Sequence, residues 1–324
     1  MKPDCCGGES DLAILGGGSA AFAAALKASE LGARVLMINE GTIGGTCVNI
    51  GCVPSKTLIR AAENAHGNRS SRFRGIEAGE GRVDFPELVR EKDELVASLR
   101  QSKYIDVASN DPKIEILEGR ARLRDAHTLE VGGALHRAGK ILIATGARPA
   151  RPPIPGLDDP GIWDSTAALD ASALPRDLIV LGGRYIALEL GQMFARLGSR
   201  VTIIQRSDQL LPGEDADLAE ALRVYLEREG IEIRTGHQVE RVTREGARWS
   251  VEASHGGRSE KLWGDAVLSA LGRAGNTEDL DGVELDARGF VRVGDDLQTS
   301  LPGVYAAGDV IGDELYVYAA AYEG

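Results

Sequence analysis

The stretch "DLAILGGGSAAFAAALKASELGARVLMIN", residues 11–39, decides the fold of this chain. An apolar strand leads through a run of glycines into an alanine-rich helix, and a second apolar strand follows. This order predicts a βαβ unit in which Gly16, Gly18 and Ala21 form a G-x-G-x-x-A pattern. Glycines at such a turn let the backbone approach a pyrophosphate, and the N–H groups at the start of the helix face the same group.

The same arrangement returns in "DLIVLGGRYIALELGQMFARLGSRVTIIQRS", residues 177–207. Gly182 and Gly183 form the turn, and Ala187 stands at the third glycine position. A single glycine turn is explained by tight packing alone about as well as by a dinucleotide site. Two complete βαβ units predict two dinucleotide sites.

Two further segments resemble each other and lie on either side of the second unit. "KILIATGARP" (140–149) and "AVLSALGRAGNT" (266–277) each read as a buried strand that ends in small residues and an arginine. The simplest interpretation is an α/β fold of two Rossmann-like domains, the second inserted in the first. The expected limits are residues 11–149 and 275–324 for the first domain and 150–274 for the second, with residues 1–10 as a flexible tail. The prolines of residues 151–161 suit the outgoing linker.

Composition excludes several classes of partner. The chain has 324 residues and a net charge of −12, with 37 Lys and Arg against 49 Asp and Glu. This balance disfavours nucleic acid and anionic membranes. No apolar run reaches the ~18 residues of a membrane span, and the N-terminus lacks the apolar segment of a secretory signal. We therefore expect a cytoplasmic protein.

Residues 83–109 predict a helical region, because apolar residues recur at helical spacing. Its charged residues are expected to form a solvated face without a function.

Two of the four cysteines lie in "GGTCVNIGCVPSK", residues 44–56. Cys47 and Cys52 follow the first βαβ unit, and Pro54 begins a good helix directly after Cys52. A helix N-terminus and the charge of Lys56 one turn later both favour thiolate. The spacing favours a redox pair over two inert thiols, and a zinc site fits poorly because only two sulfurs cluster.

This cysteine motif resembles the redox-active disulfide of the flavin-dependent pyridine nucleotide–disulfide oxidoreductases. The similarity covers about residues 11–324. Within the family, "GTIGGTC" (41–47), "IRAA" (59–62), "GQMFARLGSRVTIIQRS" (191–207) and "VYAAAYEG" (317–324) are most similar to mercuric reductases. The serine before Lys56 argues against a glutathione reductase, and valine–asparagine after Cys47 departs from the usual dihydrolipoamide dehydrogenase form.

The resemblance implies that FAD binds the first domain. Asp309, at the end of a strand in "TSLPGVYAAGDVIG" (299–312), would lie at the ribityl and phosphate region of FAD. The alternative is that Asp309 only caps a turn or a helix. The family places an acid at the end of the second strand, where this chain has Asn39 followed by Glu40. Either Glu40 takes that role by a one-residue shift, or Asn39 makes a weaker hydrogen bond and Glu40 is an ordinary exposed acid. The remaining residues expected at FAD are Gly16, Gly18, Ser19, Ala20, Ala21, Gly45, Thr46, Lys56, Thr145, Gly146 and Gly308.

By the same resemblance NADPH binds the inserted domain, with Gly182 and Gly272 among its contacts. Gln205 stands where an NAD-preferring site carries Glu, and Arg206 suits the 2′-phosphate of NADPH, with a plain surface charge as the alternative. Arg184 replaces the middle glycine, which is expected to crowd the pyrophosphate.

Two residues of the second helix also match the family. Tyr185 resembles the aromatic gate that covers the flavin until nicotinamide displaces it. Glu189, four residues later on the same helix face, resembles the partner of Lys56. Taken alone, both would more often be packing or surface residues.

The implied activity is reduction of mercury(II) to the elemental metal with NADPH. Cys52 would form the charge-transfer thiolate, and Cys47 would engage the thiol-bound mercury(II) substrate, a soft ion that favours thiolates. The alternatives are an NADPH- or NADH-dependent disulfide reductase of the dihydrolipoamide dehydrogenase or glutathione reductase type, and an FAD-binding fragment without turnover.

The end of the chain departs from the family. The resemblance implies homodimers formed through a domain that follows "YEG", and we expect this sequence to be a truncated form without that domain. For Cys5 and Cys6, near the N-terminus, the favoured interpretation is a remnant of a linker to a metal-binding domain, or an inert pair. The alternative hypothesis is that this pair captures mercury and passes it to Cys47.

Overall fold

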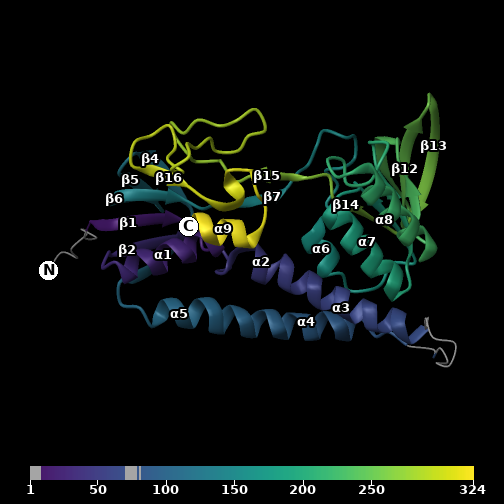
Figure 1. Cartoon of the computed structure of the whole chain (residues 1–324), viewed down its shortest axis with the longest axis horizontal. Helices are drawn as coiled ribbons and strands as arrows, with labels where there is room; N and C mark the ends of the chain where they lie inside the picture. The colour runs from purple at the N-terminus through teal and green to yellow at the C-terminus, as the bar shows by residue number, and fades with distance from the viewer. Residues whose placement is uncertain (1–8, 70–78, 80–81) are drawn as a thin grey trace. The chain divides into compact units, whose positions relative to one another are not determined.

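The computed structural model describes residues 9–69, 79 and 82–324. They form two compact α/β units (Figure 1), as the two glycine turns predict. Unit 1 contains residues 9–49, 95–148 and 273–324, and unit 2 contains 149–272 with the described part of 50–94. The chain changes unit after residues 49, 94, 148 and 272, so residues 50–94 group with unit 2. The expected domain limits stay a prediction.

The elements of unit 1 follow in chain order. They are β1 (Ser10–Leu15), α1 (Ser19–Glu30), β2 (Val35–Asn39), α2 (Gly45–Asn49), the π-helical turn η1 (Gln101–Ile105), α5 (Asp106–Ser109), β3 (Ile114–Glu118), β4 (Ala121–Asp125), β5 (Thr128–Val131), β6 (Ala134–Ile143), β7 (Ala147–Pro149), β15 (Arg273–Gly275), β16 (Val304–Ala306), the 3-10 turn η2 (Gly308–Val310) and α9 (Val317–Glu323).

The main sheet of unit 1 has the order β3-β2-β1-β6-β5-β4, and β16 pairs with β6. Strands β3, β2, β1, β6 and β16 run parallel, whereas β5 and β4 are antiparallel additions. Leu15 and Ala306 both pair with Ile143, so the carboxyl ends of β1, β6 and β16 lie at one edge. Ligands of open α/β sheets bind at this edge.

Both faces of this sheet are buried. Ile14 packs in a cluster with Ala21 and Phe22 of α1, while Ala13 and Leu15 face the opposite cluster. The continuous apolar strand 12–15 is therefore typical of a parallel strand covered on both sides.

The elements of unit 2 are α3 (Cys52–Arg69), α4 (Phe85–Arg100, in which the unit boundary falls after residue 94), α6 (Ser165–Leu169), β8 (Asp177–Leu181), α7 (Tyr185–Leu197), β9 (Arg200–Ile204), α8 (Ala216–Arg228), β10 (Glu232–Arg234), β11 (Gln238–Glu245), β12 (Arg248–His255), β13 (Arg258–Gly264) and β14 (Ala266–Ser269).

Unit 2 is built on a parallel sheet of order β10-β9-β8-β14 and an antiparallel ribbon β11-β12-β13. One face of the parallel sheet packs against helices, with Leu58 of α3 and Phe194 of α7 in one buried cluster. The other face packs toward the ribbon, where Ile179 and Val267 share a cluster with Val251. Among the described residues, no helix is both long and apolar enough to cross a membrane.

Lys92 of α4 is an exception to the expected solvated charged face, whereas Arg90, Glu91, Asp93 and Glu94 are exposed. Its side chain is only 2% exposed, and its ammonium nitrogen lies 2.6 Å from Asp170 Oδ1 and 2.7 Å from Asp93 Oδ1. Burial by itself lowers the pKa of Lys92, but the hydrogen bonds and charges of the two aspartates outweigh it and raise the pKa. The helical spacing of apolar residues did not predict the burial of Lys92, because its partner Asp170, at the end of α6, is distant in sequence.

We expect Lys92→Ala to lower the free energy of unfolding of unit 2 by about 2–4 kcal/mol, since a truncated buried side chain leaves a cavity. Lys92→Met keeps most of the volume, and both aspartates are largely exposed and stay hydrated. Its cost should therefore stay near 1 kcal/mol. Thermal and denaturant unfolding of both variants measures this, with Lys103→Met as the exposed control. Equal losses for Met and Ala would show that charge pairing, not packing, fixes α4.

Candidate functional site

The first glycine turn depends on close backbone packing. Gly16 has φ +122°, and a Cβ there would lie 2.2 Å from the carbonyl oxygen of Ala144. Helix α1 then begins at Ser19, with Gly18 as an extended N-cap that offers no side-chain hydrogen bond. The first N–H groups of α1 are thus available for an anionic ligand such as a pyrophosphate.

Helix α2 is pressed onto this turn. Gly45 has φ +67°, and a Cβ there would lie 2.5 Å from the Cα of Gly18. Thr46 and Cys47 follow directly on α2, where Cys47 is half-buried. Unit 1 therefore holds one of the two thiols at the glycine turn.

The end of β2 distinguishes Asn39 from Glu40. Asn39 is buried and donates a 2.8 Å hydrogen bond to the carbonyl of Gly41. Its Oδ1 faces the turn so closely that a Cβ on Gly17 would lie 2.5 Å from it. Glu40 is exposed. The structure thus brings Asn39, but not the Glu40 side chain, against the turn.

Thr145 and Gly146 follow β6 at the carboxyl edge of the sheet and are fastened by Asn276. The Thr145 hydroxyl donates to the Asn276 carbonyl at 2.6 Å, and the Asn276 amide donates to the Thr145 carbonyl at 2.8 Å. Asn276 was not among the predicted site residues, although the likeness of segments 140–149 and 266–277 is a signal that they lie together.

Asp309 lies on η2, directly after β16. The Gly308 N–H donates to Glu323 at 2.6 Å, and a Cβ on Gly308 would lie 3.2 Å from the Cβ of Ala20, so this turn adjoins the first turn of α1. Burial raises the pKa of Asp309, and the charge of Arg273, whose Nε lies 3.6 Å from Asp309 Oδ2, opposes that rise. Arg273 Nε is buried and makes no hydrogen bond within the described residues.

These residues make a cradle at one edge of unit 1. It joins the glycine turn, the first turn of α1, the end of β2, the start of α2, the turn after β6 and η2. The cradle fits a flavin dinucleotide, because side chains are excluded where a backbone must approach phosphate and a carboxylate stands beyond it.

The second glycine turn repeats the first. Gly182 has φ +112°, and a Cβ there would lie 2.4 Å from the carbonyl oxygen of Ala270. Helix α7 begins at Tyr185 with Arg184 as an extended N-cap. The exposed Arg184 side chain donates to the Pro212 carbonyl at 3.3 Å. It is turned toward the segment after β9.

The residues expected at the adenosine end follow β9. Gln205 is buried, and its backbone N–H donates to the Arg234 carbonyl at 2.8 Å. Arg206 is exposed. Gly272 has φ +118° with open space where its Cβ would be. The strand end is thus followed by an exposed guanidinium, a group that can pair with a phosphate.

Helix α3 begins at the second thiol. Cys52 is exposed at its first position, and Pro54 is buried in the same turn. Lys56 forms a 2.5 Å ion pair with Glu189 of α7, the pairing that the resemblance implies. Both side chains are about half exposed, so the pair orients Lys56 more than it stabilises the fold.

The unit boundary falls after residue 49, between the two cysteines, so each thiol is described in its own unit. Cys5 and Cys6 lie outside the described residues. Within the described ranges, no group of three or more His, Cys, Asp and Glu side chains could hold a metal ion.

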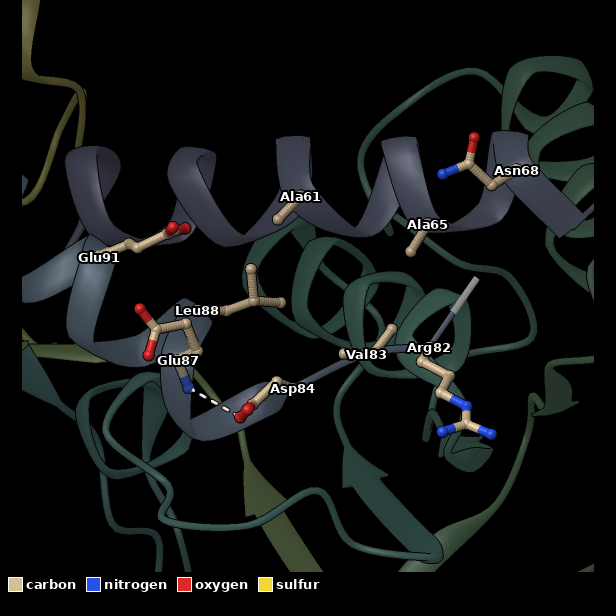
Figure 2. Close-up of a pocket in the computed structure, with 9 residues that line it drawn as sticks. All are labelled: Ala61, Ala65, Asn68, Arg82, Val83, Asp84, Glu87, Leu88 and Glu91. Atoms are coloured by element: carbon tan, nitrogen blue, oxygen red, sulfur yellow. Dashed lines mark hydrogen bonds between the residues drawn. The ribbon is translucent and has the colours of Figure 1, made fainter. Parts of the chain in front are cut away.

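A pocket of about 250 Å³ lies in unit 2 between α3 and the start of α4 (Figure 2). Ala61, Ala65 and Leu88 give it apolar walls, and Asp84 caps α4 there by accepting from the Glu87 N–H at 3.1 Å. None of the residues expected to bind a cofactor lines it.

Comparison with known proteins agrees with this geometry. A family model described as pyridine nucleotide-disulphide oxidoreductase matches residues 10–324. The chain is 43% identical over 318 residues to the mercuric reductase of Lysinibacillus sphaericus. The matched region covers 97% of this chain and 58% of that relative. It is 43% identical over 321 residues to the mercuric reductase of Staphylococcus aureus, covering 98% and 58%. The chain thus spans less than two thirds of these relatives.

Among solved structures, the Cu(II) complex of the HOCl-induced flavoprotein disulfide reductase RclA from Escherichia coli superposes with a TM-score of 0.87. The two share 32% sequence identity, over 98% of this chain and 69% of that one. Another structure of RclA gives a TM-score of 0.86 at 33% identity. The family match spans nearly the whole sequence, and it agrees with the two glycine-turn α/β units and with the thiol held at the first turn. This chain therefore belongs to the pyridine nucleotide-disulphide oxidoreductase family.

Proposed function

We propose that this chain is the two-domain part of an FAD-dependent reductase that uses NADPH to reduce mercury(II) to elemental mercury. The observation that carries the proposal is the contact of Gly45 with Gly18, which holds Cys47 beside the cradle that suits FAD. The identity of 43% to mercuric reductases supports mercury(II) as the substrate.

In this proposal unit 1 binds FAD and unit 2 binds NADPH. The N–H groups of α1 and the turn at Gly16 would hold the flavin pyrophosphate, and Asp309 would hold the ribityl chain. Asn39 meets the adenosine ribose, because its amide lies against the turn while Glu40 is exposed. Bound flavin would supply the relay of two electrons from the nicotinamide to the cysteine pair.

The chain's own residues then act on the metal. The N-terminus of α3 and the charge of Lys56 favour the thiolate form of Cys52. Glu189 holds Lys56 at 2.5 Å and so fixes the direction of that charge. Cys47, half-buried at the cradle, binds mercury(II) as a soft thiolate ligand. Overall, NADPH and mercury(II) give NADP⁺, a proton and the neutral metal.

A disulfide reductase is the second candidate, favoured by the TM-score of 0.87 to a flavoprotein disulfide reductase. Under that alternative the same thiols attack a disulfide sulfur.

Mercury(II) should trigger NADPH oxidation by the 324-residue chain supplied with FAD and excess small thiol. Cys47→Ala should abolish this oxidation while leaving FAD binding intact, because the thiol and not the cradle is lost. Absorbance at the NADPH band, with glutathione disulfide as the competing substrate, measures both. Oxidation driven by the disulfide and not by mercury would favour the second candidate, and flavin binding without any oxidation would indicate a fragment without turnover.

Arg206→Gln should raise the KM for NADPH about tenfold or more, since hydrogen bonds to charged groups contribute about 1.5–3 kcal/mol. The KM for NADH should not change, because NADH lacks the 2′-phosphate. Arg228→Gln, another exposed arginine of unit 2, is the control. An equal rise for both coenzymes would assign Arg206 to the surface and not to the phosphate.

Asp309→Asn should weaken FAD binding by about tenfold or more, through loss of a charge-assisted hydrogen bond. The same change should raise the melting temperature of the apoprotein at pH 7. Burial raises the folded-state pKa of Asp309 above its ordinary 3.8, so the ionised carboxylate destabilises the fold as pH rises through that range. The gain should vanish below about pH 3.8, where Asp309 is protonated in both states. FAD titration and thermal scans across pH test this, and unchanged FAD affinity would remove Asp309 from the site.

A further inference from the structure

The segment after β9 is fastened to the second glycine turn. Residues 209–214, here named the strap, contact three consecutive residues of that turn. The Leu211 N–H donates to the Gly183 carbonyl at 2.8 Å, and Arg184 donates to the Pro212 carbonyl at 3.3 Å. The Tyr185 hydroxyl donates to Glu214 Oε1 at 2.6 Å. All of these residues belong to unit 2.

The strap has its own internal structure. Leu211 adopts φ +47°, a conformation that side chains rarely take, and its side chain is buried in the helix-facing cluster. The Glu214 N–H donates to the Leu211 carbonyl at 2.9 Å, and Gln209 donates to the Glu214 carbonyl at 3.0 Å. The backbone of Glu214 is therefore held in place, and its carboxylate is a fixed acceptor for Tyr185.

Tyr185 stands at the first position of α7, where the proposed dinucleotide approaches the turn. Its side chain is 48% exposed, so packing alone does not fix it. The carboxylate of Glu214 is the strong acceptor in this contact, because hydrogen bonds to ionised groups exceed neutral ones. A dinucleotide that displaces the Tyr185 ring has to break this bond.

We propose that Glu214 is a positioning residue that holds Tyr185 in its coenzyme-free place, so that the Tyr185–Glu214 hydrogen bond opposes NADPH binding. This inference rests on the proposed NADPH site. The apparent affinity of a ligand falls with the fraction of protein in the competent state, so breaking the bond tightens binding. A merely structural contact would act in the opposite direction, because its loss would loosen the turn and weaken binding.

The test measures NADPH dissociation constants of the full chain by titration calorimetry, for the unchanged chain, Tyr185→Phe, Glu214→Ala and the double variant. We expect each single variant to bind NADPH about three- to tenfold more tightly and the double variant to match the singles, since all three lack the same bond. Binding of 2′,5′-ADP, which lacks the nicotinamide half, should not change. Tyr225→Phe, an exposed tyrosine on α8, is the control, and melting temperatures confirm that each variant folds.

Glu214→Gln separates the hydrogen bond from charge repulsion. The amide oxygen of glutamine still accepts from Tyr185, so this variant should stay closer to the unchanged chain than Glu214→Ala does. If Gln and Ala tighten binding equally and Tyr185→Phe has no effect, repulsion of phosphate explains the result and the inference is overturned. Weaker binding, additive effects or unchanged constants also overturn it. Failure of the unchanged chain to bind NADPH would overturn the proposed function itself, and the positioning role with it.

Discussion

The structure depends on one constraint that occurs twice, namely backbone contact where a side chain cannot fit. A Cβ on Gly16 would lie 2.2 Å from the Ala144 carbonyl oxygen, and one on Gly182 would lie 2.4 Å from that of Ala270. In both units a strand end turns so tightly against a neighbouring parallel strand that the following helix starts at the carboxyl edge of the sheet. The N–H groups of α1 and α7 thereby face the place where a dinucleotide binds in such folds.

Much of this fold could be predicted from the sequence, because its determinants are local. Apolar runs, glycine turns and helical spacing lie within about 30 residues in each βαβ unit, and the structure confirms the α/β fold with two such units. The pairing of Lys56 with Glu189 could be expected from the family resemblance. The roles of the candidate site residues stay predictions.

What the sequence could not reveal rests on contacts between distant residues. Lys92 looks like one charge of a solvated helix, and only its approach to Asp170 explains its burial. Asn276 closes the Thr145 turn from 131 positions away. The closeness of the Asp309 carboxylate to the Arg273 guanidinium likewise depends on the position of η2, which lies far from Arg273 in sequence.

The two turns share one geometry but are closed differently, and this difference matches the needs of two kinds of cofactor. The first turn is closed by backbone, because Gly45 packs on Gly18 with no room for a side chain. Such a contact opens only if α2 moves, which suits a group that stays bound. At the second turn, exposed side chains supply two of the strap's contacts, through Arg184 and Tyr185. Single side chains rotate on a ps–ns timescale without refolding. A site closed in this way suits a coenzyme that must enter and leave in every catalytic cycle.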